Sequence, residues 1–302
     1  MLDVNRLQVL LHVIEEGSVT AAAARLQYSP SAVSQQLRRL EREVGQPLLT
    51  RHARGMVPTE AGQVLAGHAR KVVRQLTAAE ADLAEIAGLR RGQLSIGTFA
   101  TVGSSFVPLA VQRFRQLYPS IRLHIHSDRE QGLIDKLEEG EVGLSLLWDY
   151  EWRRIDPSQV ALTTLFEDPT VLVVAADHPL AGERSVHMRD LADEGWIIRS
   201  EQHPVVEVLH RSAAAAGFEP RISFEANDYQ EAQAMVSVGF GVALAPRTAL
   251  TNKHPGVRIV SLGDSAPPRR IVVAHRHDRV RAPAEIAFHE VLLDMAQGYE
   301  PD

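Results

Sequence analysis

The sequence predicts an α+β multidomain protein with three parts in chain order. A winged helix-turn-helix occupies residues 1–58, a long dimerisation helix with a hinge occupies 59–91, and a two-lobed α/β domain occupies 92–302. Three observations support this prediction. Helical patterns with clear start and stop residues fill the first part, an apolar heptad repeat follows, and short apolar runs then alternate with helical patterns to the end of the chain.

Composition and charge limit the function classes. The chain has no cysteine, which excludes disulfides, thiolate zinc sites and thiol nucleophiles and fits a reducing cytoplasm. Polar residues interrupt the N-terminus and no apolar run reaches the ~18 residues of a membrane span, so we expect a cytoplasmic protein without a membrane partner. Residues 1–58 hold seven arginines and five acidic residues in a chain of net charge −6. A basic N-terminal part on an acidic body is typical when that part alone meets a polyanion.

The first part is predicted to hold three short helices. After a first amphipathic helix, Ser18 is placed to cap a second helix over Val19–Leu26, whose alanines allow another helix to approach closely. Ser29 and Pro30 start a third helix, which ends at Gly45. Its polar face suits phosphate and base-edge contacts in a major groove, although an ordinary solvated helix face is the alternative. That face carries Ser31, Ser34, Gln35 and Arg38.

The segment from Gln46 to Pro58 predicts a short β-wing. It places Arg51, His52 and Arg54 around a glycine, so that basic side chains reach flanking phosphates or the minor groove.

These residues together resemble the LysR-type transcriptional regulators. The matching residues are Gly17–Ala23, Leu26, Ser29–Ser34, Leu40, Glu41, Gly45, Leu48, Leu49, Arg51 and Pro58–Gly62. Two positions depart from the family pattern, with Leu49 where Phe is usual and Ser29 where Gln is common. The resemblance implies a DNA-binding transcription regulator that is not an enzyme and has no cofactor. The predicted DNA-contacting residues are Ser18, Thr20, Ser29, Ser31, Ser34, Gln35, Arg38, Arg51, His52 and Arg54.

A heptad repeat follows Thr59, which is placed to cap a long helix. Its apolar positions are Leu65, Ala69, Val72, Leu76, Ala79, Leu83 and Ile86. Charged residues flank this seam, which predicts pairing of two chains; a helix packed on its own body is the alternative. Pairing would set two recognition helices on a two-fold axis, as half-sites in double-stranded DNA require. Residues 88–92 would form a hinge.

The remaining chain predicts two α/β lobes, lobe I over about 92–165 and 268–302 and lobe II over about 166–267. Repeated strand–helix units indicate a parallel sheet with crossover helices. Phe166–Pro169 and Ser265–Arg269 are the expected crossings between the lobes. Such a pair of lobes is similar to periplasmic solute-binding proteins, as the sensor domain of the LysR family is.

Ligands on such sheets bind beyond the carboxyl ends of the strands. The first strand ends in a hydroxyl-rich loop, which suits an anion, with simple helix capping as the alternative. Thr98 and Thr101 also match positions that often contact the effector in the family. Asp149, His203 and Asp228 are further candidates because they also follow or end strands. The predicted effector-binding residues are Thr98, Phe99, Ala100, Thr101, Ser127, Asp128, Trp148, Ser200, Gln202 and Asn227.

Two other classes of function remain open from the sequence. An enzyme is possible on an α/β sheet, but the chain lacks the dinucleotide, nucleophile-elbow, phosphate-loop and zinc-protease motifs. A DNA-architectural protein that binds no small molecule is the second alternative, but it would assign no function to the more than two hundred residues of the two sensor-like lobes. His124 with His126, and His275 with His277, alternate on strands; an exposed polar strand face explains this spacing better than a metal site does.

The expected mechanism is therefore effector-controlled regulation. A small effector, either a carboxylate or another anion, would change lobe closure in a homodimer or homotetramer. That change would alter the spacing of the DNA-binding heads at a promoter and, indirectly, the access of RNA polymerase. Pattern alone does not distinguish activation from repression, or a dimer from a tetramer.

Overall fold

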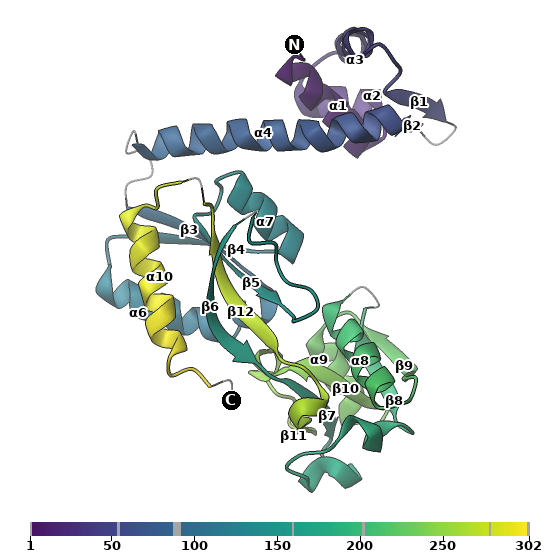
Figure 1. Ribbon diagram of the computed structural model, residues 1–302, viewed down its shortest axis with the longest axis vertical. Helices are drawn as coiled ribbons and strands as arrows, with labels where there is room; N and C mark the ends of the chain where they lie inside the picture. Colours follow the sequence, from purple (N-terminus) through teal and green to yellow (C-terminus); the bar gives the residue numbers. More distant parts are fainter. Residues whose placement is uncertain are drawn as a thin grey trace. The chain divides into compact units, whose positions relative to one another are not determined.

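The computed structural model describes residues 2–52, 55–86, 92–158, 160–200, 203–277 and 279–300. Two compact units make up the chain: Met1–Leu89 with Glu138–Glu141, and Arg90–Leu137 with Val142–Asp302. The predicted fold class is confirmed, because helices of a winged helix-turn-helix precede a long helix and two mixed α/β lobes (Figure 1).

The N-terminal unit holds the three predicted helices and the wing. They are α1 (Val4–Glu16), α2 (Val19–Leu26), α3 (Pro30–Val44), β1 (Leu49–His52) and β2 (Gly55–Pro58). The start signals act as expected: the hydroxyl of Ser18 accepts from the amide of Ala21, and that of Ser29 accepts from the amide of Ala32. Gly45 ends α3 in the left-handed conformation, with φ 82°.

Close backbone approaches hold the wing against the helices. The amide of Met56 donates to the carbonyl of Gly17 at 2.8 Å. One carboxylate oxygen of Glu41, on α3, accepts from the amides of Leu48 at 2.9 Å and Leu49 at 3.4 Å. These bonds fix the start of the wing on the helix that carries the polar face.

The long helix α4 (Glu60–Ile86) extends well beyond the three helices gathered at its N-terminal end (Figure 1). Accordingly, the predicted seam divides into two parts. Ala69 is fully buried in the core of its own unit, whereas Val72, Leu76 and Leu83 are 42%, 46% and 65% exposed. The alternative of packing on the chain's own body therefore describes the first part of the seam, and the second part offers an apolar face.

The second unit contains two five-stranded sheets, one in each lobe. The lobe I sheet has the order β4-β3-β5-β12-β6, and the lobe II sheet has the order β11-β7-β10-β8-β9. The lobe I strands are β3 (Gln93–Thr98), β4 (Arg122–Ser127), β5 (Leu144–Asp149), β6 (Ala161–Asp168) and β12 (Arg269–His275). The lobe II strands are β7 (Thr170–Ala175), β8 (Gly195–Arg199), β9 (Arg221–Ala226), β10 (Val242–Pro246) and β11 (Val257–Ser261).

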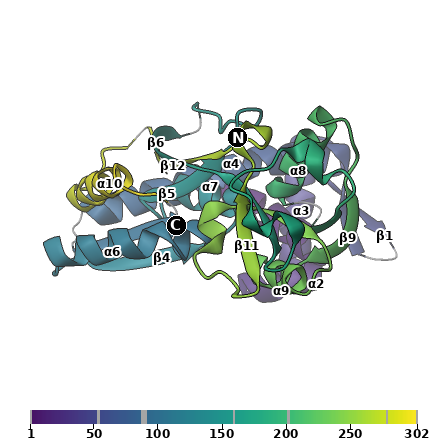
Figure 2. The ribbon, with the colours of Figure 1, turned by 90° about the horizontal axis from the view of Figure 1, so that it is seen from below.

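Helices pack on both sheets. Lobe I carries α5 (Ala100–Gly103), α6 (Phe106–Leu117), α7 (Glu130–Glu138) and α10 (Pro283–Ala296), and lobe II carries α8 (Pro204–Ala215) and α9 (Tyr229–Ser237). Short 3₁₀ helices are η1 (Pro179–Gly182), η2 (Met188–Leu191), η3 (Arg247–Leu250) and η4 (Gly263–Ser265). Helices α6 and α10 lie side by side (Figure 2), and the rings of Phe114 and Phe288 meet edge to face between them, 5.1 Å apart.

The sheets are mixed, which corrects the prediction of a parallel sheet. Strands β3, β4 and β5 pair parallel, as do β8, β9 and β10. The strands at the lobe junction do not: β12 is antiparallel to β5 and β6, and β7 is antiparallel to β10 and β11. The local sequence pattern does not indicate strands β6 and β11.

Candidate functional site

The polar face of α3 is accessible as predicted. Ser31, Gln35 and Arg38 are exposed and Ser34 is half-buried, while Val33 and Leu37 on the other face belong to the core. The hydroxyl of Ser29 caps α3 and also lies 2.9 Å from that of Ser31. Ser18 caps α2 in the same way, so capping by itself accounts for both N-cap serines.

The remaining predicted DNA contacts lie on α2 and the wing. Thr20 is exposed on the first turn of α2, and Arg51 and His52 are exposed on β1. Arg54 lies outside the described residues. The described basic wing residues are thus free to reach a polyanion.

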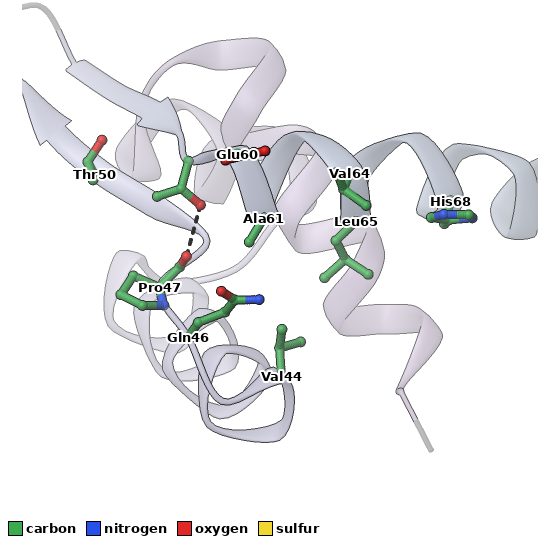
Figure 3. A pocket seen from close by; sticks show the side chains of 10 residues that line it. Val44, Gln46, Pro47, Thr50, Glu60, Ala61, Val64, Leu65 and His68 are labelled. Carbon is green, nitrogen blue, oxygen red and sulfur yellow. Dashed lines mark hydrogen bonds between the residues drawn. The ribbon is translucent and has the colours of Figure 1, made fainter.

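A groove runs between the end of α3, the wing and the start of α4 (Figure 3). Val44, Pro47 and Thr50 line one side, and Val64 and His68 of α4 line the other. The hydroxyl of Thr59 donates to the carbonyl of Pro47 at 2.9 Å and so ties the two sides together. Val64 is 60% exposed here, which extends the apolar surface of α4 toward its N-terminus.

The second unit holds a cavity of about 300 Å³ between its two lobes. Strand ends of both lobes converge on it, as expected if a ligand binds beyond the carboxyl ends of the strands. Its lining residues are Phe99, Ala100, Thr101, Asp128, Arg129, Glu130, Gln131, Trp148, Arg153, Arg199, Ser200, His203, Pro204, Asn227 and Arg269.

Seven of the ten predicted effector-binding residues meet at this cavity: Phe99, Ala100, Thr101, Asp128, Trp148, Ser200 and Asn227. Thr98 is buried in the sheet, with its hydroxyl 3.5 Å from the carbonyl of Phe99, and Ser127 does not line the cavity either. Gln202 lies outside the described residues. Of the other candidates, His203 lines the cavity. Asp149 instead pairs with Arg270 at 2.6 Å, and Asp228 caps α9.

Capping explains part of the hydroxyl-rich loop after β3. The hydroxyls of Ser104 and Ser105 donate to the carbonyl of Thr101, at 3.0 and 2.8 Å, and close the turn. The hydroxyl of Thr101 instead accepts a hydrogen bond of 2.6 Å from Arg269. One residue of this loop, therefore, belongs to the polar network of the cavity.

An apolar wall and a buried ion pair shape the base of the cavity. The rings of Phe99 and Trp148 are 4.4 Å apart, and the guanidinium of Arg269 lies 5.3 Å from the Phe99 ring. Arg269 is only 3% exposed and pairs with the fully buried Asp168 at 2.8 Å. The carboxylate of Asp168 also accepts from the amide and hydroxyl of Thr248, at 3.0 and 2.7 Å.

Arginine dominates the charge of the lining. Arg129, Arg153, Arg199 and Arg269 face two acidic residues, Asp128 and Glu130. Arg153 pairs with Glu130 at 3.1 Å, whereas Arg199 has no carboxylate partner among the described residues. The guanidinium of Arg199 instead lies 4.9 Å from the Tyr229 ring and 2.9 Å from Nε2 of His203.

Burial and these cations shift the pKa of neighbouring groups. Burial first, and then the charges of Arg199, Arg269 and Arg129, lower the pKa of His203 to about 3, so its imidazole is neutral near pH 7. Burial raises the pKa of Tyr229 to about 12. The positive charge of the cavity therefore comes from arginine alone.

Sequence reasoning missed the arginines of the cavity. Arg199 is the last residue of a buried strand, and that position was its only signal. Arg269 begins a strand that pairs antiparallel with partners about a hundred residues earlier, so no local pattern points to the cavity. Ser200, beside Arg199, adopts a left-handed backbone with φ 43°, which is uncommon for a residue other than glycine.

Two other kinds of feature, a metal centre and a membrane span, are absent from the described residues. Within the described ranges, no three histidine, aspartate or glutamate side chains come together as metal ligands. No described helix combines the length and the apolar character needed to cross a membrane.

Comparisons with known proteins cover both units. A model of the LysR substrate binding domain matches residues 87–297, and a model of the bacterial regulatory helix-turn-helix protein, lysR family, matches residues 4–63. The RuBisCO operon transcriptional regulator of Allochromatium vinosum is 28% identical over 298 residues, covering 97% of this chain and 96% of the relative. The HTH-type transcriptional regulator AlsR of Bacillus subtilis is 30% identical over 253 residues, 82% of each protein.

Solved structures share the fold at low identity. CbnR, a LysR family transcriptional regulator, gives a TM-score of 0.65 at 19% identity over 98% of this chain and 99% of CbnR. CbnR has also been solved in complex with its target DNA; that structure gives the same TM-score and identity and covers 97% of this chain and 100% of its own. A full-length OxyR variant from Pseudomonas aeruginosa gives 0.64 at 22% identity, over 99% of this chain and 95% of its own.

Proposed function

The chain belongs to the LysR family of bacterial transcription regulators, and we propose that a small anionic effector in the cavity between its lobes controls how it binds promoter DNA. It is a DNA-binding regulator with an effector-binding domain rather than an enzyme. The observation that carries the anionic effector is the arginine-rich lining: four guanidinium groups against two carboxylates in a cavity of about 300 Å³. Phe99 and Trp148 would take the hydrocarbon body of a carboxylate.

The proposed DNA-binding surface is the polar face of α3 with the wing. Ser31, Gln35 and Arg38 are exposed there and have the chemistry that reads base edges, while Arg51 and His52 would contact flanking phosphates. CbnR, which shares the fold, has been solved in complex with its target DNA. We propose α3 as the recognition helix of this chain because its polar face is exposed and has base-reading chemistry.

The proposed assembly is a homodimer or homotetramer paired through α4. Val72, Leu76 and Leu83 form an exposed apolar stripe at heptad spacing, which a second copy of the helix would cover. Two paired heads would read half-sites related by a dyad, and a change in their spacing would alter the access of RNA polymerase.

A peroxide response through thiol oxidation is not available to this chain. The hydrogen peroxide-inducible genes activator of Escherichia coli is 27% identical over 91% of this chain, but the present sequence has no cysteine to oxidise. The proposed signal is accordingly a bound ligand.

The DNA-binding half is tested by titrating the purified protein onto its own upstream intergenic DNA at several salt concentrations. Arg38→Ala is expected to lower specific affinity by about 10- to 100-fold and to relax sequence preference. Arg113→Ala removes the same charge from the exposed face of α6 and should leave affinity unchanged. If Arg38→Ala, Gln35→Ala and Ser34→Ala all bind like the wild type, α3 does not read the operator through this face.

The effector half is tested with organic acids added to the same protein–DNA complex. One or more acids should shift operator affinity, and Arg199→Gln should remove that shift without changing affinity in the absence of acid. A shift of equal size in Arg199→Gln would contradict a role for the cationic lining.

A further inference from the structure

Tyr28 is an aromatic residue that lies exposed in the turn of the helix-turn-helix. It stands between the end of α2 and Ser29, the N-cap of α3, and it is 51% exposed. Its hydroxyl has no hydrogen-bond partner among the described residues. Two local motifs meet at this position, and each of them commonly packs an apolar side chain here.

The first motif is the cap that ends α2. The amide of Tyr28 donates to the carbonyl of Ala23 at 2.9 Å, and the amide of Gln27 donates to the carbonyl of Ala24 at 3.3 Å. Gln27 has the left-handed conformation that this cap requires, with φ 57°. The residue in the place of Tyr28 usually packs against the helix that it follows. These bonds fix the backbone of Tyr28 against α2.

The second motif is the start of α3. A residue directly before an N-cap often packs on the fourth residue of the helix, which is Val33 here. Val33 is fully buried in the core of its unit, but Tyr28 does not belong to the core cluster that the described residues form. Neither motif therefore buries the ring. The turn presents it to solvent on a backbone that is held at both ends.

The surroundings of Tyr28 favour a polyanion. Between Gly17 and Leu40 the sequence contains three arginines and no acidic residue. The acidic residues that precede this stretch, Glu15 and Glu16, pair with Arg25 at 3.6 and 2.9 Å. No carboxylate of this stretch would thus repel a phosphate brought close to the turn.

We propose that Tyr28 is a DNA-contacting residue whose hydroxyl donates a hydrogen bond to a backbone phosphate beside the major groove that receives α3. This rests on the proposed use of α3 as the recognition helix. The turn before a recognition helix lies where the helix enters the groove, next to the phosphates of its edge. Tyrosine hydroxyls are among the groups that contact phosphate and fix the register of a protein on the duplex.

The proposed contact differs from an arginine contact in two measurable ways. A tyrosine hydroxyl is an uncharged donor, so it releases no counterion and leaves the salt dependence of binding unchanged. A phosphate contact also carries no sequence information, so its loss weakens operator and unrelated DNA alike. Loss of a base contact, as proposed for Arg38, instead relaxes sequence preference.

The test compares wild type with Tyr28→Phe, which removes the hydroxyl and keeps the ring. Full-length protein is titrated onto a fluorescently labelled duplex of its upstream intergenic DNA and onto an unrelated duplex of the same length, at several salt concentrations. Tyr28→Phe should lower affinity for both duplexes by about 5- to 20-fold, the loss expected for one hydrogen bond to a charged group. The ratio of the two affinities and the slope against salt should stay as in wild type.

Tyr118→Phe is the matched control, because it removes a hydroxyl from another exposed tyrosine, 36% exposed at the end of α6. It should bind both duplexes like wild type. Thermal unfolding of Tyr28→Phe should match wild type, since the ring does not belong to the core.

Three results would overturn the contact. Wild-type affinity in Tyr28→Phe would show that the hydroxyl does not meet DNA, and a loss confined to the operator would assign it to a base edge. A smaller assembly of Tyr28→Phe in sedimentation would place the tyrosine at a subunit interface. In each case a weakened Arg38→Ala would leave the proposed role of α3 standing, whereas a wild type without preference for its own upstream DNA would remove that role as well.

Discussion

At the scale of single residues, His203 sits between two N–H donors. Its Nδ1 accepts from the amide of Val205 at 3.3 Å and caps α8, while Nε2 lies 2.9 Å from the guanidinium of Arg199. A second ring proton would meet one of these donors, which adds to the effect of burial and agrees with a pKa lowered to about 3. The imidazole is thus neutral near pH 7 and adds no positive charge to the cavity.

This shift makes stability depend on pH. Between pH 3 and 6.5 the imidazole is neutral in the folded state but protonated in the unfolded state. The free energy of unfolding therefore rises with pH across that window and decreases as the pH falls through it. His203→Asn keeps an N-cap acceptor and removes the titration. When the pH is lowered from 7.5 to 5, the free energy of unfolding should decrease by about 1–2 kcal/mol less in the variant than in wild type. Urea unfolding followed by tryptophan emission measures this, since all three tryptophans lie in the second unit; equal losses in both proteins would contradict it.

The expectation that ligands bind beyond the carboxyl ends of strands identified cavity residues at the ends of parallel strands. It did not identify Arg269, which begins an antiparallel strand. Phe99 follows β3, Trp148 lies near the end of β5, and Asn227 follows β9. The carboxyl ends of parallel strands meet at these positions. Arg269 enters the cavity from the start of β12, whose partner β6 lies about a hundred residues earlier. Its position depends on a tertiary pairing that no local pattern encodes.

At the scale of elements, caps and periodicity predicted the N-terminal unit well because its contacts are local. The sequence pattern does not indicate strand β6, because Ala161–Asp168 mixes threonines and acidic residues without a regular alternation of apolar residues. Its pairing with β12 stabilises it instead. Strands of this kind are specified by their neighbours in the sheet more than by their own residues.

Helix α4 contains two glycines with opposite roles. A Cβ on Gly62 would lie 2.0 Å from the carbonyl oxygen of Leu48, at the start of the wing, whereas a Cβ on Gly67 would meet nothing within 4 Å. Gly62→Ala should therefore displace the wing and destabilise the N-terminal unit by about 1–3 kcal/mol, while Gly67→Ala should stabilise it by about 0.5–1 kcal/mol through helix propensity. Thermal unfolding followed by circular dichroism compares the two; shifts of the same sign would refute the close approach at Gly62.

At the scale of the whole molecule, charge is divided between the parts. Residues 1–58 carry a net charge of +2, so the remaining residues carry −8. The acidic body repels anions at long range, and screening limits that repulsion to about 8 Å at physiological ionic strength. The proposed binding of an anion in the cavity would thus depend on the few arginines that line it, and DNA binding on the N-terminal head.

In the proposed assembly, pairing through α4 would join these local features into one DNA-binding unit. Leu83 is 65% exposed and does not belong to the core cluster that the described residues of its unit form. Leu83→Asp should therefore leave the fold intact and place a carboxylate in the paired seam. The variant should assemble to a smaller species, which sedimentation equilibrium measures, and its operator affinity should fall by about 10²- to 10⁴-fold because the two heads no longer bind as one ligand. Gln75→Glu, an exposed position of α4 outside the heptad seam, supplies the charge-matched control. A Leu83→Asp protein with wild-type mass and affinity would show that the exposed stripe of α4 is not what pairs the heads, and the groove beside Val64 would then be the next surface to substitute.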